Sequence, residues 1–151
     1  MAGEHSGMVA PFSGGCACGQ VRYVCASAPI AMINCHCRDC QRSSGAPFAS
    51  GVVVLAADVR VAGTPTTYAV RGSSGNPTVR SFCSTCGSPL FAQSAAANGF
   101  MSIRFPSLDD QSTFKPMLDI WTSSAQPWIC MDDAIPHFAE SPQGPPPVRA
   151  T

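Results

Sequence analysis

Seven of the nine cysteines in this chain fall into short clusters whose spacing suits metal binding. A Cys-x-Cys pair near the N-terminus and a Cys-x-x-Cys pair in the middle of the chain together supply four thiolates, from Cys16, Cys18, Cys83 and Cys86. Four thiolates make a closed tetrahedral site of the kind that structural zinc occupies. We therefore expect these residues to hold one structural zinc ion, which ties the N-terminal strand to the middle of the chain.

A second cluster lies between those two pairs and contains three cysteines, Cys35, Cys37 and Cys40. Catalytic zinc typically keeps three protein ligands and one position for water or substrate. Three thiolates make the zinc a poor generator of hydroxide and suit it better to binding a substrate thiol. A thiol bound there ionises at neutral pH and becomes a nucleophile. The cluster therefore predicts a catalytic zinc that helps to form or break a carbon–sulfur bond.

Other interpretations of the cysteines stay open. A disulfide framework is disfavoured, because the number of cysteines is odd and no export signal is visible. An iron–sulfur cluster would use the same thiolates, although the paired spacings are more typical of zinc. A fourth protein ligand, such as Cys25, Cys130 or His137, could also close the three-cysteine site and make it structural.

In the Cys35–Cys37 segment, the His36 side chain is expected to point in a different direction from the two cysteine side chains. In extended backbone, side chains two residues apart share a face, so Cys35 and Cys37 can reach one ion while His36 points away. We expect His36 to be a partly exposed imidazole outside the metal site. Cys40 would return to the ion from a turn.

The loop that follows this cluster carries a cation among hydroxyls and glycine, which makes Arg42 a candidate for binding a substrate carboxylate. Arg38 or Arg104 could assist, because a guanidinium fork pairs well with carboxylates. For each of these residues a solvated surface arginine is an equally good interpretation.

Short runs of β-forming residues recur along the chain, and no segment shows a sustained helical period. The predicted strands are Val21–Val24, Ala31–Cys35, Ala49–Val54, Val59–Ala62, Thr66–Arg71, Thr78–Cys83, Leu90–Gln93, Phe100–Phe105 and Met117–Thr122. We expect one all-β domain of small antiparallel sheets over residues 12–140, stapled by the structural zinc. Disordered ends are expected at 1–11 and at 141–151, the second being rich in proline.

Two turns support the strand pattern. The Gly72–Pro77 segment separates two predicted strands and is typical of a hairpin connection. Asn98 and Gly99 directly precede another strand, and an Asn-Gly pair can supply the two positive φ angles of a tight hairpin.

Composition excludes several function classes. The net charge is zero and only 12% of residues are charged, so nothing draws the chain to nucleic acid or to an anionic membrane surface. The N-terminal residues lack an apolar run with a basic flank, and no run of apolar residues is long enough to span a membrane. The sequence therefore predicts a soluble, cytoplasmic protein.

Three segments carry a family resemblance: Gly14-Gly15-Cys16-x-Cys18-Gly19-x-Val21-Arg22-Tyr23, Cys35-His36-Cys37-x-x-Cys40-Gln41-x-x-x-Gly45-Ala46 and Phe82-Cys83-x-x-Cys86-Gly87-x-x-Leu90. A weaker match follows at 116–121, Trp128 and Pro136-x-Phe138. From Phe12 to about Pro142 the chain resembles the glutathione-dependent formaldehyde-activating enzyme family, which shares its domain with centromere protein V. Members often carry histidine where this chain has Asp119.

The resemblance implies a small fold of the β-tent type with two zinc ions, a structural ion at Cys16, Cys18, Cys83 and Cys86 and a catalytic ion at Cys35, Cys37 and Cys40. It also implies a carbon–sulfur lyase that condenses formaldehyde with glutathione to S-(hydroxymethyl)glutathione. Two alternatives remain, a zinc-stabilised binding module without catalysis and an enzyme of the same architecture that acts on a small molecule other than a thiol.

Overall fold

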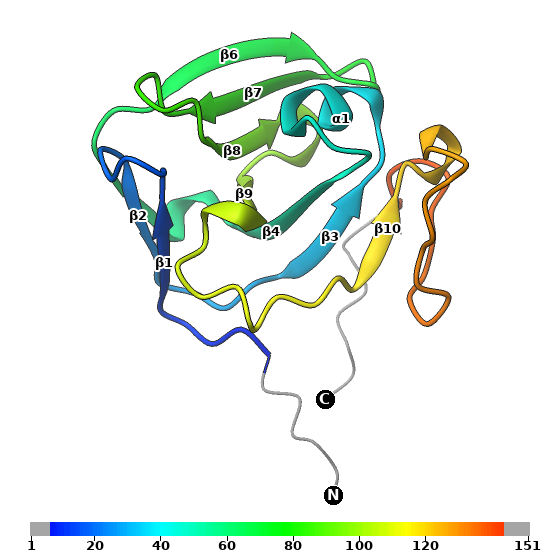
Figure 1. Cartoon of the computed structure of the whole chain (residues 1–151), viewed down its shortest axis with the longest axis horizontal. Helices are drawn as coiled ribbons and strands as arrows, with labels where there is room; N and C mark the ends of the chain where they lie inside the picture. Colours follow the sequence, from blue (N-terminus) through cyan, green and yellow to red (C-terminus); the bar gives the residue numbers. More distant parts are fainter. Residues whose placement is uncertain (1–6, 144–151) are drawn as a thin grey trace, which may run out of the picture.

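The computed structural model describes residues 7–143, whose strands form two sheets (Figure 1). The smaller sheet has the order β1-β2-β5 and consists of β1 (Phe12–Gly15), β2 (Arg22–Cys25) and β5 (Val59–Ala62). The larger sheet has the order β10-β3-β4-β9-β8-β7-β6. Its strands are β3 (Ala31–Cys35), β4 (Ala49–Leu55), β6 (Thr66–Arg71), β7 (Pro77–Phe82), β8 (Pro89–Ser94), β9 (Phe100–Arg104) and β10 (Leu118–Ile120). The all-β prediction is confirmed.

One strand pair differs from the expected antiparallel arrangement. β10 lies parallel to β3, with Asp119 opposite Asn34 and Ile120 opposite Cys35. The long connection between these strands lets the chain return in the same direction, which a short hairpin would forbid. The parallel pairing brings the C-terminal part of the domain alongside the Cys35 end of β3.

The alternation of side chains along the strands explains where the core forms. In β2, Tyr23 and Cys25 are buried while Arg22 and Val24 are exposed, the pattern of a sheet with one solvated face. In β4, Val52 and Val54 are buried in the same way. These inward faces pack together, and the Tyr23 ring meets Phe91 of β8 edge-on at a centroid distance of 5.3 Å. The hydrophobic core therefore lies between the two sheets.

A short helix, α1 (Arg38–Ser44), occupies the segment where the sequence predicted a turn. It begins after Cys37, whose sulfur accepts a hydrogen bond from the backbone N–H of Cys40 at 3.3 Å. It ends at Gly45, which adopts a left-handed conformation with φ 67° and donates its N–H to the Gln41 carbonyl. Seven residues are too few to show a helical period, so only the capping residues could have marked this helix.

Three 3₁₀ segments connect the strands, at η1 (Ala56–Asp58), η2 (Ala95–Ala97) and η3 (Phe105–Ser107), and a fourth, η4 (Thr122–Ser124), follows β10. The hairpin predicted between β6 and β7 is confirmed, with the Gly72 N–H bound to the Asn76 carbonyl at 2.9 Å. The turn before β9 differs from the prediction, because Gly99 has φ 86° but Asn98 has φ −57°. A single positive φ at the second turn residue is typical of a type II turn.

The predicted disordered ends lie mainly in residues 1–6 and 144–151, which are outside the described part of the chain. Of the remaining N-terminal residues, Met8 is buried in the core cluster. Within residues 7–143, no helix combines the length and the apolar character needed to cross a membrane.

Candidate metal centres

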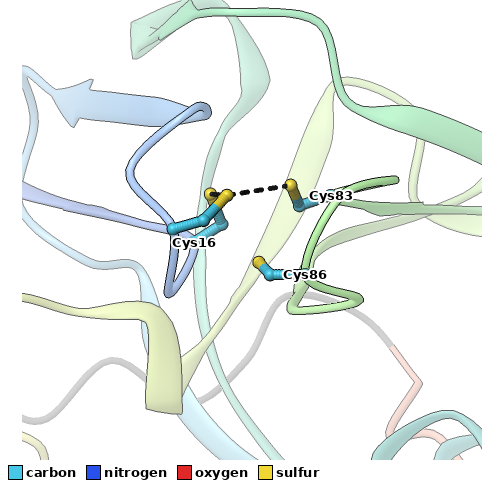
Figure 2. A group of neighbouring side chains, drawn as sticks. Cys16, Cys83 and Cys86 are labelled. Atoms are coloured by element: carbon cyan, nitrogen blue, oxygen red, sulfur yellow. Dashed lines mark hydrogen bonds between the residues drawn. The ribbon is translucent and has the colours of Figure 1, made fainter.

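The first cysteine cluster joins the two sheets. Cys16 and Cys18 lie in the β1–β2 turn, and Cys83 and Cys86 lie in the β7–β8 turn, so that the four sulfurs converge (Figure 2). All four sulfur atoms lie within 4.8 Å of one another, with Sγ–Sγ distances of 3.5 Å for Cys16–Cys18 and 3.7 Å for Cys18–Cys83. Tetrahedral zinc with Zn–S bonds of about 2.3 Å requires sulfurs about 3.8 Å apart. The four residues therefore fit such an ion.

The two turns are built alike. Each pair of cysteines is followed by a glycine in the left-handed region, Gly19 with φ 79° and Gly87 with φ 75°. This conformation costs glycine little and lets the chain reverse tightly around the sulfurs. The backbone N–H of Val21 donates to the Cys16 sulfur at 3.2 Å, which stabilises a thiolate there.

The surroundings of Cys16, Cys18 and Cys86 shift their pKa values in different directions. A hydrogen bond from the Val21 N–H lowers the pKa of Cys16, and the Ser88 hydroxyl leads the contacts that lower the pKa of Cys86 to about 5. The Gln20 N–H favours the Cys18 thiolate, but burial and the neighbouring thiols raise the pKa of Cys18 to about 12. Thiolates this close repel one another, so a divalent cation is needed for all four to ionise together.

The second cluster lies on the other side of the larger sheet from the core. Cys35 ends β3, Cys37 caps the N-terminus of α1, and Cys40 sits in its first turn. Their sulfur atoms also lie within 4.8 Å of one another, and Cys35 and Cys37 are buried. The helix, rather than a simple turn, brings Cys40 back to its two partners.

Burial and the closeness of the three thiols shift their pKa values in different directions. The pKa of Cys35 is raised, because the thiols of Cys37 and Cys40 and then burial disfavour its charged form. The pKa of Cys40 is lowered to about 2 by hydrogen bonds from Cys35 and Cys37, with further help from the charges of Arg104 and Arg80. One thiolate forms readily while the others resist, so full ionisation again calls for a cation. This donor set fits a soft divalent metal such as zinc.

The candidate fourth ligands lie elsewhere. Cys25 is buried in the core between the sheets, and Cys130 lines a pocket of about 190 Å³ together with Asn34 and Asp132. His137 lies near Asp119. Among residues 7–143, neither metal-binding cluster includes any of these candidates. All nine cysteines, which fall within the described range, are free thiols.

His36 differs from the sequence expectation, because its imidazole is 1% exposed rather than partly exposed. Its Nε2 lies 2.7 Å from the Asp119 carboxylate, which is itself 2% exposed on β10. It does point away from the sulfur cluster, as predicted, since it lines the pocket that Cys130 also lines. Asp119 therefore faces a buried imidazole rather than solvent, and it fixes the residue between Cys35 and Cys37.

We expect Asp119→Ala to destabilise the zinc-loaded protein by about 1 to 3 kcal/mol, because it leaves a buried imidazole without a partner. His137→Ala is the matched control, since its Nε2 lies 3.7 Å from the same carboxylate and its side chain is 30% exposed. Urea unfolding of both variants checks this. Equal midpoints for Asp119→Ala and the unmodified protein would contradict it.

Gln41 is a positioning residue that the sequence did not reveal. Its Nε2 donates to the carbonyl of His36 at 2.7 Å and to that of Ser124 at 3.0 Å. Its Oε1 accepts from Arg38 and from Gln126. The buried amide thus connects α1 to the His36 segment and to η4. Its only sequence signal is its place directly after Cys40 in the family motif.

The arginines are arranged differently from the sequence expectation. Arg42 is exposed in the last turn of α1, about 200° around the helix from Cys40, and its substrate-binding role stays a prediction. Arg104 is buried and its Nη2 donates to Ser43 at 3.1 Å. Arg80 of β7, which the sequence did not single out, also places its charge near Cys40. Arg80 could have been found in the sequence as a charged residue at a strand position that alternates with exposed ones.

Comparison with known proteins identifies the family. A family model described as glutathione-dependent formaldehyde-activating enzyme matches residues 11–124, which include both cysteine clusters. The chain belongs to this family. No curated protein gives a significant match to this member of the glutathione-dependent formaldehyde-activating family. The crystal structure of a Rhodobacter sphaeroides protein is similar in fold, with 22% identity and a TM-score of 0.52, covering 64% of this chain and 87% of that one.

Proposed function

We propose that this protein is a zinc-dependent carbon–sulfur bond enzyme resembling S-(hydroxymethyl)glutathione synthase. Its substrates would be a small thiol such as glutathione and a small aldehyde such as formaldehyde, or a thioether conjugate in the reverse direction. Membership of the glutathione-dependent formaldehyde-activating family supports this choice of substrates.

The observation that carries the proposal is the contrast between the two clusters. Four sulfurs converge in the first, whereas the second has three, with no fourth cysteine, histidine or carboxylate grouped with them in residues 7–143. Four protein ligands are typical of structural zinc, and three are typical of catalytic zinc. We assign the first ion a structural role and the second a catalytic role on this basis.

The protein's own groups then hold and orient the reactants. Cys35, Cys37 and Cys40 would bind the second zinc ion, which supplies a position where a substrate thiol ionises at neutral pH. Gln41 keeps the Cys35–Cys37 segment fixed against α1. In the forward reaction the sulfur–carbon bond forms as the π bond of the aldehyde breaks. The aldehyde oxygen takes up the proton that the thiol has lost, so no oxidant or reductant is required.

Native mass spectrometry of the purified protein, with and without glutathione, tests the proposal. We expect two zinc ions per chain and a glutathione adduct, and no adduct with S-methylglutathione, whose sulfur cannot ionise. Two zinc ions with equal binding of both ligands would contradict the thiol-binding role. One zinc ion and no adduct would favour a binding module or a substrate of another class.

A further inference from the structure

Two arginines share a sheet face with the three-cysteine cluster, and the strand register places the first of them. Cys35 of β3 lies opposite Ala49 of β4, and Gly51, two residues further along β4, lies opposite Arg104 of β9. Cross-strand partners project from the same face of a sheet, as do residues two apart on one strand. Arg104 and Cys35 therefore project from the same face.

The register extends this face to the second arginine. Ser102, two residues before Arg104 on β9, lies opposite Ala92 of β8, and Ala92 lies opposite Arg80 of β7. All the positions between Cys35 and Arg80 in this cross-strand series, other than Arg104, carry small side chains. Two guanidinium groups therefore project from the face that carries the cluster, and they are the charged side chains of this cross-strand series.

Neither guanidinium has a carboxylate partner in residues 7–143. Arg104 is 6% exposed, and its one side-chain hydrogen bond to the described residues goes to the Ser43 hydroxyl. The Nη1 of Arg80 is buried and has no hydrogen-bond partner in this part of the chain. A buried charge without a charged partner is costly, which applies to Arg104, and the half-buried Arg80 has a buried donor without an acceptor. Both groups therefore favour the binding of an anion.

The helix α1 connects the cluster to β9 and to the β6–β7 hairpin, which carry the two arginines. Ser43, which Arg104 contacts, lies three residues after Cys40 and thus on the same side of α1. The hairpin that carries Arg80 reaches the same helix, because the Ser73 hydroxyl in the β6–β7 turn donates to the Asp39 carboxylate of α1 at 3.3 Å. Three thiolates around a divalent cation offset only one of the two positive charges, which leaves room for a further anion.

We propose that Arg80 and Arg104 form a subsite that binds a carboxylate of the thiol substrate beside the three-cysteine cluster. This inference rests on the proposed function for the thiol, and it names the substrate class as thiols that also carry a carboxylate. A carboxylate accepts two parallel hydrogen bonds from one guanidinium, which a sulfur ligand cannot do. The sequence expectation placed this role at Arg42, with Arg38 or Arg104 assisting, so the subsite keeps Arg104 and adds Arg80.

Matched thiols with and without a carboxylate test the subsite on the full-length protein. Isothermal titration calorimetry compares 3-mercaptopropionate with 2-mercaptoethanol, and glutathione with glutathione diethyl ester, which probes a longer reach. We expect at least one carboxylate-bearing thiol to bind about 10- to 100-fold more tightly than its neutral partner, the range for charge-assisted hydrogen bonds. A cobalt-substituted sample, whose sulfur-to-metal absorption reports each added thiolate, is titrated in parallel.

Substitutions of the arginines show which residues produce the preference for carboxylate-bearing thiols. We expect Arg80→Gln and Arg104→Gln to lose the preference for carboxylate-bearing thiols. The corresponding lysine variants should keep part of this preference, and Arg60→Gln should keep all of it. Arg60 is the control because it is exposed on β5 of the smaller sheet. Thermal melting confirms that each variant is folded.

Several outcomes would overturn the subsite. In the unmodified protein, equal affinities within both ligand pairs would do so. If Arg80→Gln and Arg104→Gln kept the preference for carboxylate-bearing thiols, the subsite would be wrong. It would also be wrong if both variants bound neutral and carboxylate-bearing thiols equally more weakly, because the arginines would then only offset the charge of the cluster. A preference lost in Arg42→Gln instead would return the role to Arg42. Carboxylate-dependent binding without a change in the cobalt spectrum would support the subsite and contradict the thiol-binding function.

Discussion

Cys83→Ser is expected to leave little folded protein at room temperature. The substitution removes one of four thiolates from the cluster that joins the β1–β2 turn to the β7–β8 turn. Structural zinc contributes about 10 to 16 kcal/mol in small zinc domains, which is comparable to the whole stability of a typical domain of about 5 to 15 kcal/mol. Cys83 is also 2% exposed, so the serine hydroxyl would be buried beside the remaining sulfurs.

The measurement for Cys83→Ser is soluble yield together with circular dichroism melting and zinc content. Cys130→Ser is the matched control, since Cys130 is exposed and belongs to neither metal cluster. We expect the control to melt like the unmodified protein and to keep its zinc. A soluble Cys83→Ser protein with an unchanged, cooperative melt would show that the four-sulfur cluster does not carry the fold.

Cys40→Ser is expected to abolish activity while leaving the domain folded. Cys40 is one of three sulfurs in the second cluster and lies on α1, outside the core between the sheets. Its loss leaves two thiolates, too few for a catalytic zinc site with three protein ligands. We expect one zinc ion per chain instead of two, and a loss of unfolding free energy below about 2 kcal/mol.

Measurements of stability and of reaction rate distinguish a structural from a catalytic role for the second cluster. Zinc content and melting temperature report the fold of Cys40→Ser, and nuclear magnetic resonance of glutathione mixed with formaldehyde reports the rate of adduct formation. That rate should fall to the rate without protein, because the two reactants also combine unaided. If Cys40→Ser were as unstable as Cys83→Ser, the second cluster would be structural as well.

Much of this fold could be predicted because its strands carry strong local patterns. The predicted ranges Ala31–Cys35, Val59–Ala62 and Thr66–Arg71 coincide with β3, β5 and β6. β1 was missed, because its four residues include two glycines and only one residue with strong β propensity. α1 was missed because a seven-residue helix stabilised by its caps and neighbours has no periodic signal of its own.

The grouping of the cysteines could be predicted from the sequence, but the surroundings of the clusters could not. Cysteine spacing marks the three-cysteine cluster and the two separate pairs, since each short motif keeps its members close whatever the fold. The meeting of the two pairs was inferred from the four ligands that a closed zinc site requires. The partners of His36 and the position of Arg80 depend on strand register instead. Asp119 meets His36 only because β10 returns parallel to β3, and Arg80 joins the cluster's face only through three intervening strands. A local sequence pattern does not predict such long-range contacts, because they depend on how distant strands pair.

The order of the cysteines along the chain has a consequence for biosynthesis. Cys18 and Cys83, which meet in the four-sulfur cluster, are separated by 65 positions, whereas Cys35, Cys37 and Cys40 lie within six consecutive residues. A growing polypeptide therefore exposes the complete three-cysteine motif while half of the other cluster has yet to be translated. A metal ion can reach the three-cysteine cluster first, and an ion can complete the four-sulfur cluster only after residue 86 has left the ribosome.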